Sequence, residues 1–430
     1  MSLSRRHLLK NLGVLAGGSV MVRLVSVATT LVVTRALGPT GFGVLSSGLA
    51  IAAVVGVCAN LGLEDYVTRQ VARAPERAAE ALGEALVARL VAMPVAALAA
   101  LALALAVPRA ALVFACLIVY SLLHSYLLLV CAVFRGLQRM EAQSLLLGTQ
   151  IVLIAGGAVG ATALTHDPLP VAAAYLLATA ATLGLTAWLL RRVGIHVCYS
   201  LSSPWRRVLR ASAPFGLTAV GVVVYDRVGA VAVLALCGAS AAGLFNAAYS
   251  LVLALTSLPS VAVAALYPSL AAMARGDRRA LTAVSGRLVG AALAGGLLLA
   301  LCVDLAGPTL VARLFGGAYL GAAAILTLLA WSLPPLFMTI VLVGILEAAD
   351  RQRACAGAVG LALAVGAPAS MAATWLWGLQ GATAAYVLAH AVLAAMLTWL
   401  AAPIAGWIRP ADAPRTAALD AAPLHGPGSG

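Results

Sequence analysis

Hydrophobic and polar positions alternate in long blocks along this chain, with apolar runs of about 20 to 25 residues separated by short clusters of charge. A helix needs about 20 apolar residues to cross the hydrocarbon core of a bilayer. The pattern therefore predicts an all-α integral membrane protein with about 12 transmembrane helices. We expect these helices at residues 12–34, 42–63, 85–107, 110–134, 144–164, 169–190, 211–236, 241–273, 284–305, 322–346, 354–375 and 381–402.

The run at 241–273 is longer than one crossing requires. Pro259 and Pro268 lie within it, and proline cannot donate the backbone hydrogen bond that a helix interior needs. We therefore expect this helix to kink or to end near one of these prolines.

Basic residues test the number of helices, because the cytoplasmic flanks of membrane helices carry an excess of Lys and Arg. With twelve crossings and the N-terminus inside, 22 of the 27 Lys and Arg residues fall on the cytoplasmic side. Three fall outside (Arg35, Arg109 and Arg313), and two lie near mid-membrane depth (Arg23 and Arg227). We therefore expect a multi-pass protein of the cell (inner) membrane with both termini in the cytoplasm.

The N-terminal segment Ser4-Arg5-Arg6 resembles a twin-arginine export signal. A cleaved signal has a short apolar core followed by a soluble domain. Here the apolar run continues beyond Arg23 to Val33, and eleven further runs follow. We interpret the arginines as the basic flank that orients the first helix.

Composition leads to the same class of protein and narrows its partners. Hydrophobic residues make up 63% of the chain and charged residues 10%, so the apolar surface must face lipid. The net charge of +13 does not indicate nucleic-acid binding, because the arginines mark loop ends and do not form one basic face. The seven cysteines form no CxxC pair and no cluster with several histidines, so we expect no metal and no cofactor.

The chain divides into two similar halves. A polar connector at 191–210 separates an N-terminal lobe (1–190) from a C-terminal lobe (211–402), and the Pro- and Ala-rich stretch 403–430 is expected to be a disordered cytoplasmic tail. At an offset of 200 residues, Gly38 aligns with Gly238 and Gly43 with Gly243. Six helices per half make this a parallel repeat, an arrangement associated with alternating access.

Three charged side chains lie deep in the expected helices: Arg23 in the first, and Asp226 and Arg227 in the seventh. A charge at the centre of a spanning helix costs about 2.5–3.5 kcal/mol on insertion scales, and such residues usually line an enclosed or wet path. The 200-residue offset places Arg23 and Arg227 about one helical turn apart in the repeat, at similar depth. We therefore expect both lobes to present charge at one level of the membrane.

Short motifs in both halves resemble the polysaccharide transporter family, the O-antigen-type branch of the multidrug/oligosaccharidyl-lipid/polysaccharide exporter superfamily. The likeness extends over roughly residues 10–400, and it is carried by the order and spacing of 34–43 (TRALGPTGFG), 59–63 (ANLGL), 69–73 (RQVAR), 213–215 (APF), 225–227 (YDR), 243–249 (GLFNAAY), 266–268 (LYP), 314–319 (LFGGAY) and 377–382 (WGLQGA). Asn60 departs from the family, which often has Asp there. Residues 27–34 lack the Arg-Asp pair of the lipid II flippase branch, so a peptidoglycan precursor is disfavoured as cargo.

The resemblance implies a V-shaped, two-lobe flippase that moves polyprenyl-pyrophosphate-linked oligosaccharide from the cytoplasmic to the outer leaflet. Guanidinium groups bind phosphate oxygens in pairs, so Arg23 and Arg227 are candidates for contact with the pyrophosphate. Asp226 is a candidate partner or cation/proton relay. Hydroxyl, amide and aromatic groups suit sugars, and the candidates for these contacts are Asn246, Tyr249, Ser250, Ser121, His124 and Ser125.

The same residues also admit structural interpretations. Arg23 could pair with Asp226 and simply join the lobes, and His124 could be a satisfied interior histidine. We interpret His390 and Asn60 as polar groups that pack helices together.

Two rival functions remain open at this stage: a cation-coupled multidrug exporter of the same superfamily, and a non-transporting scaffold for polysaccharide assembly. A polysaccharide polymerase or glycosyltransferases are candidate protein partners, whether the chain is a flippase or a scaffold for polysaccharide assembly. Two arginines against one aspartate favour anionic cargo over a cationic drug. No GxxxxGK[ST] loop and no nucleophile–base set is found in the sequence, so we do not expect an enzyme.

Overall fold

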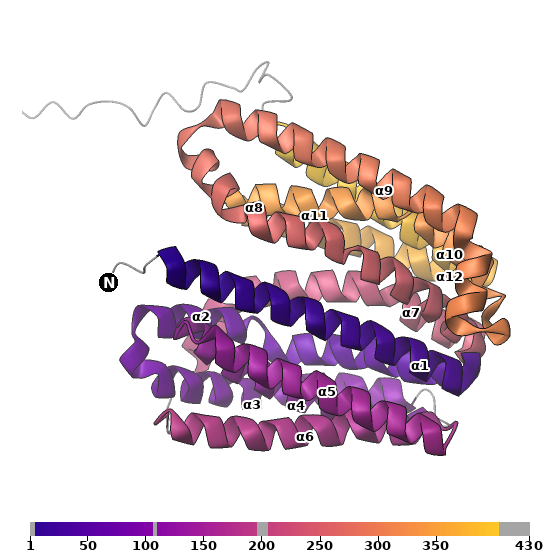
Figure 1. Ribbon diagram of the computed structural model, residues 1–430, viewed down its shortest axis with the longest axis horizontal. Coiled ribbons are helices and arrows are strands. Elements are labelled where there is room, and N and C mark those ends of the chain that lie inside the picture. Colours follow the sequence, from indigo (N-terminus) through magenta and orange to yellow (C-terminus); the bar gives the residue numbers. More distant parts are fainter. Residues whose placement is uncertain (1–4, 106–109, 196–204, 404–430) are drawn as a thin grey trace, which may run out of the picture.

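The computed structural model describes residues 5–105, 110–195 and 205–403, and this part of the chain is almost entirely helical (Figure 1). The N-terminal lobe contains α1 (Arg5–Asn60), α2 (Leu63–Arg73), η1 (Pro75–Arg77), α3 (Ala78–Leu105), α4 (Ala111–Gly136), α5 (Met140–Leu164) and α6 (Pro168–Arg192). The C-terminal lobe contains α7 (Trp205–Leu255), α8 (Ser257–Gly276), α9 (Arg278–Phe315), η3 (Gly317–Tyr319), α10 (Ala322–Ala330), α11 (Leu333–Ala348) and α12 (Gln352–Ala401). The fold is an all-α membrane bundle of two pseudo-symmetric lobes, as the hydropathy pattern predicts.

Three helices contain a sharp internal turn at glycine. Gly38 in α1 has φ 66° and ψ 175°, Gly238 in α7 has φ 85° and ψ 175°, and Gly378 in α12 has φ 57°. Positive φ is readily available only to glycine, so each helix breaks there into two segments. These breaks fall between expected helices 1 and 2, 7 and 8, and 11 and 12.

The number of crossings follows from these breaks. Seven described helices are long and apolar enough to span a bilayer, and α10 with α11 forms an eighth span bent by 45°. Three of the seven are the broken helices α1, α7 and α12, each of which holds two segments. The second segment of α7 continues into α8. With α3 as a further segment, the described chain supplies the twelve crossings of the predicted fold.

The helix expected at 241–273 is interrupted slightly before both of its prolines. The α7 helix ends at Leu255 and α8 begins at Ser257, so Pro259 falls within the first turn of a new helix. The first turn tolerates proline because its N–H groups have no partner within the helix. Pro268 lies inside α8 without ending it.

One helix is not predicted by the hydropathy pattern. The helix α2 is short and amphipathic, with Leu63, Val67 and Val71 buried and Asp65 and Arg73 exposed. It lies between the second and third crossings and packs its apolar face on α3 and α4.

The third crossing begins earlier than expected, at Ala78 instead of residue 85. Arg89 therefore lies inside α3, where its side chain is fully buried. Arg89 is one of the 22 basic residues counted as cytoplasmic, and the structure places its side chain inside the bundle, where it donates to the carbonyl oxygen of Ser125 on α4. The excess of cytoplasmic basic residues does not depend on this one position.

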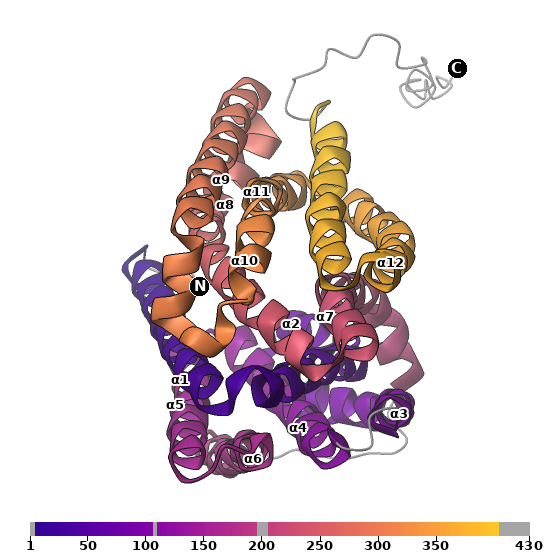
Figure 2. The ribbon, with the colours of Figure 1, turned by 90° about the vertical axis from the view of Figure 1, so that its right-hand side faces the viewer.

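The seam between the lobes is formed mainly by α1 and α7, which lie side by side in both views (Figures 1 and 2). A Cβ atom added to Gly43 would lie 1.8 Å from the carbonyl oxygen of Ala239, and one added to Gly243 would lie 1.8 Å from the carbonyl oxygen of Pro39. The two contacts are equivalent, because the 200-residue offset relates Gly43 to Gly243 and Pro39 to Ala239. At the other end of the seam, Gly216 touches the backbone of Leu61.

The outside of the bundle is apolar, as a lipid-facing surface must be. Leu164, Leu305 and Trp375 are 86%, 77% and 74% exposed. The buried core instead runs along the seam and through each lobe, with Phe114, Phe245 and Tyr319 among its largest members. We call the end of the molecule that carries Gly38, Gly238 and Gly378 the glycine-turn end.

Candidate functional site

A cavity of about 310 Å³ lies inside the C-terminal lobe, between α7, α11 and α12. Most of its wall is apolar, and its polar lining includes Asp226, His390, Tyr225, Tyr249, Tyr386 and Thr339. It therefore combines a carboxylate, an imidazole and three tyrosines in one partly open space.

Asp226 and His390 face each other in this cavity. The Oδ1 atom of Asp226 lies 3.7 Å from Nε2 of His390, and the two side chains are 36% and 3% exposed. The Nδ1 atom of His390 lies 3.0 Å from the carbonyl oxygen of Tyr386, which can only accept, so the hydrogen-bond network assigns a proton to Nδ1. In the neutral ring, Nε2 is then an acceptor opposite another acceptor. The pair is suited to hold a proton or a cation between these two atoms.

Aromatic rings surround the pair. The ring centroid of His390 lies 4.2 Å from that of Tyr386 and 5.0 Å from that of Tyr225. Tyr249 packs edge-on against Tyr386 at 5.5 Å. The histidine is thus held in one orientation by contacts from two helices.

Several buried donors near this cavity have no partner in the described part of the chain. They include the hydroxyl groups of Tyr225 and Thr339, which belong to the cavity wall, and Nδ2 of Asn246, which lies one turn before Tyr249. Buried polar groups are normally hydrogen-bonded, so unpartnered ones call for a physical explanation. Here they are consistent with a site that accepts polar ligand atoms.

Arg227 takes a different direction from Asp226, because adjacent residues of a helix point about 100° apart. Its guanidinium carbon lies 5.8 Å from the centre of the Tyr249 ring. None of the carboxylates in the described residues lies within 4.0 Å of it. Arg23 lies in α1, but its side chain is outside the described part of the chain, so the expected meeting of Arg23 with Arg227 stays a prediction.

The N-terminal lobe holds a second polar cluster, around His124. Its Nδ1 lies 2.9 Å from Nε2 of Gln150, which also donates to the hydroxyl of Thr179 at 2.9 Å. Tyr120 stacks on His124 with ring centroids 5.7 Å apart. His124 is thus bonded within its own lobe and half-buried, away from the Asp226 cavity.

The candidate serines are engaged with main-chain carbonyl groups. Ser121 donates to Ala52, Ser125 to Leu122 and Ser250 to Ala247. Ser121 and Ser125 are also buried, so they serve helix packing in this structure.

His390 is the functional candidate that sequence reasoning missed, and an internal repeat could have found it. Residues 173–180 read AAYLLATA and residues 384–391 read AAYVLAHA. This match pairs Tyr175 with Tyr386 and Thr179 with His390, at an offset of 211 residues. The 200-residue offset, which relates the first helices of the two lobes, does not bring these two segments into alignment.

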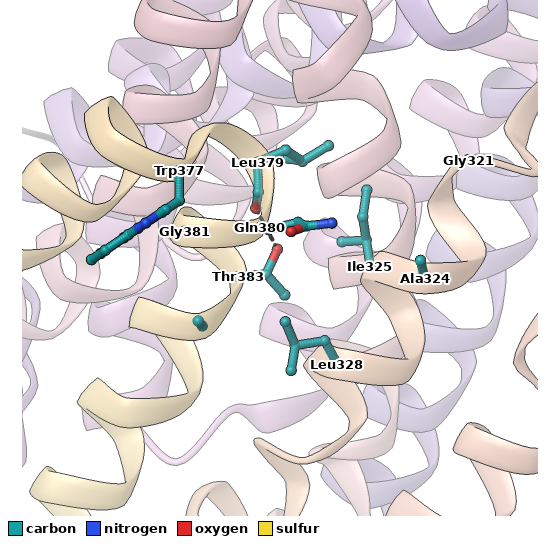
Figure 3. A pocket seen from close by; sticks show the side chains of 10 residues that line it. Gly321, Ala324, Ile325, Leu328, Trp377, Leu379, Gln380, Gly381 and Thr383 are labelled. Carbon is teal, nitrogen blue, oxygen red and sulfur yellow. Dashed lines mark hydrogen bonds between the residues drawn. The ribbon is translucent and has the colours of Figure 1, made fainter.

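A larger pocket, of about 560 Å³, opens at the glycine-turn end of the C-terminal lobe (Figure 3). Gln380 points from α12 toward Ile325 of α10, and the Thr383 hydroxyl donates to the carbonyl oxygen of Leu379. Its lining contains no titratable side chain. Of these two pockets, the smaller one around Asp226 and His390 carries the titratable side chains.

Metal-binding chemistry does not stand out in the described residues, where no group of three or more His, Cys, Asp or Glu side chains could hold an ion. Polar ligands in the C-terminal lobe would instead meet one acid, one imidazole and several hydroxyl groups.

Comparison with known proteins gives a family and a fold. A model of the family described as polysaccharide biosynthesis protein matches residues 8–274. Curated protein sequences give no match.

Three solved structures share the fold. Lipid II flippase MurJ in an inward closed conformation is 11% identical with a TM-score of 0.70, over 90% of this chain and 87% of that one. An inward-facing multidrug resistance MATE family transporter of the MOP superfamily is 16% identical with a TM-score of 0.59, over 90% and 95%. A MOP superfamily transporter from Pyrococcus furiosus is 15% identical with a TM-score of 0.53, over 93% and 95%.

Proposed function

Because the chain belongs to the polysaccharide biosynthesis protein family and has the fold of the MOP-superfamily transporters, we propose that it is a flippase for polyprenyl-pyrophosphate-linked oligosaccharide. It moves the head group of this lipid from the cytoplasmic to the outer leaflet by alternating access of its two lobes. The isoprenoid tail stays in the membrane, and the protein carries the pyrophosphate and the sugars across.

The observation that carries this proposal is the separation of Arg227 from its neighbouring acid. Asp226 faces His390, and Arg227 lies over Tyr249 with no carboxylate of the described chain within 4.0 Å. Its guanidinium thus forms no ion pair within the described chain. A half-buried guanidinium without an ion-pair partner suits phosphate oxygens, which it binds through paired hydrogen bonds. We assign Arg227 and Arg23 to the pyrophosphate.

Sugar recognition falls to groups next to this arginine. Tyr249 offers an aromatic ring, and Asn246 carries a buried amide donor without a partner among the described residues. Unpaired donors in a dry site reward a ligand that supplies matching oxygens. We assign both residues to the glycan, with His124 as a candidate from the opposite lobe.

Energy coupling is assigned to Asp226. The facing acceptor atoms of Asp226 and His390 offer a site for a proton or a cation. Loading and unloading of that site supplies a driving force that does not require nucleotide hydrolysis. The protein acts as a transporter and not as an enzyme.

A specific observation favours a second function, export of organic cations. Asp226 is 36% exposed inside an aromatic-lined cavity, and aromatic rings with a carboxylate attract cations. The two functions differ in the sign of charge that the cargo carries. A scaffold without transport has neither requirement, and its insertion would be easier without the buried charges.

The setting follows from the proposed cargo. We place the protein in the inner membrane with both termini in the cytoplasm, where it takes its substrate from glycosyltransferases and delivers it to a polysaccharide polymerase. Membrane lipids are its surrounding partners.

Charge reversal at Arg227 tests the proposal. In a strain that lacks the native copy, Arg227→Glu should cause the lipid-linked glycan to accumulate at the cytoplasmic face, as measured by mass spectrometry and outer-face labelling. Arg227→Lys should retain part of the export, because it keeps the charge and loses the paired geometry.

Each rival makes a different prediction for the same variants. Organic-cation export would persist or improve in Arg227→Glu. A scaffold would show defects only in proportion to lost protein in the membrane. Normal glycan export by a well-folded Arg227→Glu variant would overturn the proposed function.

A further inference from the structure

Side-chain hydrogen bonds join the two lobes at the glycine-turn end. Arg35, at the end of the first crossing, extends to the C-terminus of α9 in the opposite lobe. Tyr319, on η3 of the C-terminal lobe, reaches back to Thr34. Three hydrogen bonds between described residues therefore cross from lobe to lobe at this end.

Arg35 binds carbonyl groups that the helix itself leaves open. Its Nε donates to the carbonyl oxygen of Leu314 at 2.6 Å, and its Nη2 donates to that of Arg313. The last four carbonyl groups of a helix have no partner within the helix, and the helix C-terminus carries a partial negative charge. An arginine of one lobe thus caps a helix of the other.

Tyr319 supplies the second contact from a fully buried position. Its side chain is 0% exposed, and its hydroxyl donates to the carbonyl oxygen of Thr34 at 2.8 Å. Thr34 is also fully buried. The turn that follows Arg35 is held from its own lobe, where Nδ1 of His166 donates to the carbonyl oxygen of Ala36 at 2.9 Å.

The internal repeat shows that the arginine cap has no counterpart at the equivalent position. At the 200-residue offset the position of Arg35 corresponds to Ala235, whose methyl side chain cannot donate hydrogen bonds. The close glycine contacts of the seam are duplicated, and the arginine cap is not. It is therefore an addition to the symmetric seam and not a product of the repeat.

We propose that Arg35 and Tyr319 form a latch that holds the glycine-turn end shut, and that the latch must break for the lobes to separate there. The proposal rests on the alternating access of the proposed function. All three bonds join parts of the chain about 280 residues apart, since their separations are 278, 279 and 285 residues. Rocking of one lobe against the other at this end lengthens all three together.

Distance measurements across the latch test it. In a cysteine-free background, spin labels at Leu164→Cys and Leu320→Cys place one probe on each lobe at exposed sites near this end, where the two leucines are 86% and 55% exposed. Purified full-length protein in nanodiscs should give one dominant short distance. Arg35→Ala and Tyr319→Phe should each raise the longer-distance population about five- to tenfold. A tenfold rise corresponds to about 1.4 kcal/mol.

Arg313→Ala is the matched control. Its side chain is exposed and takes no part in the latch, while its main-chain carbonyl, the acceptor of Arg35, survives the substitution. It removes the same charge from the same end of the molecule and should leave the distances unchanged. Size-exclusion profiles identify any variant that fails to fold, and Tyr319→Phe keeps the buried ring in place.

The outcomes separate this proposal from the proposed function. Unchanged distances in folded Arg35→Ala and Tyr319→Phe proteins would overturn the latch, whatever the cargo. The measurement contains no cargo, so a latch that opens as expected in a protein without glycan-lipid transport would count against the function alone. An equal shift in Arg313→Ala would mean that charge, not capping, holds the end shut, and would also overturn it.

Discussion

Gly43 and Gly243 occupy equivalent places on the two sides of the lobe seam, and each lies against the turn that precedes the other. A Cβ atom on either would lie 1.8 Å from a main-chain carbonyl oxygen of the opposite lobe. Such an overlap with backbone cannot be relieved by a side-chain rotation. The seam therefore requires glycine at both positions.

Alanine at either position should separate the lobes at this point. We expect Gly43→Ala and Gly243→Ala each to destabilise the closed seam by about 1–3 kcal/mol, the range for overpacking of a well-packed interior. Thermal unfolding of detergent-purified protein measures the loss. Gly148→Ala is the control, because that helical glycine has nothing within 4 Å of an added Cβ and alanine favours helix. Equal melting temperatures for all three variants would contradict the close contact.

Removal of either member of the Asp226–His390 pair should uncouple transport from its driving ion. Asp226→Asn and His390→Gln each leave one acceptor without its counterpart. We expect a loss of gradient-driven flipping of at least about tenfold, since groups that transfer protons commonly contribute about 100-fold or more. Proteoliposomes with an imposed pH or sodium gradient measure this loss.

The double variant sharpens the test of the same pair. If the two groups share one proton or cation, Asp226→Asn with His390→Gln should be little worse than either single variant. Additive losses would show that the two residues act separately. Substitution of Asp304, which lies within α9 and does not line the cavity, is the control carboxylate.

Glu64 should make stability depend on pH. It lies on α2 with 19% of its side chain exposed, accepts a hydrogen bond from Asn60, and has Arg135 4.0 Å away. Burial raises the pKa of this carboxyl group, and Arg135 and Asn60 oppose the rise only in part. The folded protein therefore binds the proton more tightly than the unfolded chain does. Stability from this group is present at low pH and is lost as pH rises from about 4.5 through the folded-state pKa.

Glu64→Gln removes that dependence. At neutral pH we expect the variant to be as stable as the parent or more stable by up to about 1 kcal/mol, because amide and acid differ little in shape and no charge is buried. Unfolding temperatures recorded between pH 4.5 and pH 8 provide the comparison. A steeper pH dependence in the variant would contradict the assignment.

Arg89 provides a test of a buried charge. Its Nη1 donates to the carbonyl oxygen of Ser125 at 2.8 Å and its guanidinium lies 4.3 Å from the Tyr126 ring centre, while Nε and Nη2 have no partner among the described residues. Arg89→Met keeps most of the volume and removes the desolvated charge, so it should not lower the melting temperature. Arg89→Ala should lower it, because a cavity remains. A loss of transport in the stable methionine variant would assign the charge to function.

Hydropathy alone predicted the twelve crossings, because the length and spacing of apolar runs reflect the membrane and not the partners of each residue. The glycine offset likewise predicted matching turns, and Gly38 and Gly238 share one backbone conformation. The burial of Arg89 and the existence of α2 could not be found this way. An average over about 20 residues does not resolve an amphipathic helix of eleven or the partner of a single side chain.

The candidate site was predicted only in part. Asp226 and Tyr249 do line one cavity, but the partner of Asp226 is His390, from a helix about 160 residues later in the chain. Periodicity places a residue on a face of its own helix and does not say which helix covers that face. The repeat that links Tyr175 with Tyr386 carries the missing information, and it requires a second offset.

The reciprocal contacts of Gly43 and Gly243 have the geometry of an isologous dimer whose two subunits have been fused into one polypeptide. In a dimer of identical chains a substitution appears on both sides of the interface at once. In this single chain the two sides differ, with Asp226 and His390 in one lobe and His124 and Gln150 in the other. An isolated N-terminal lobe would still carry half of a self-complementary surface, and it should pair with a second copy of itself.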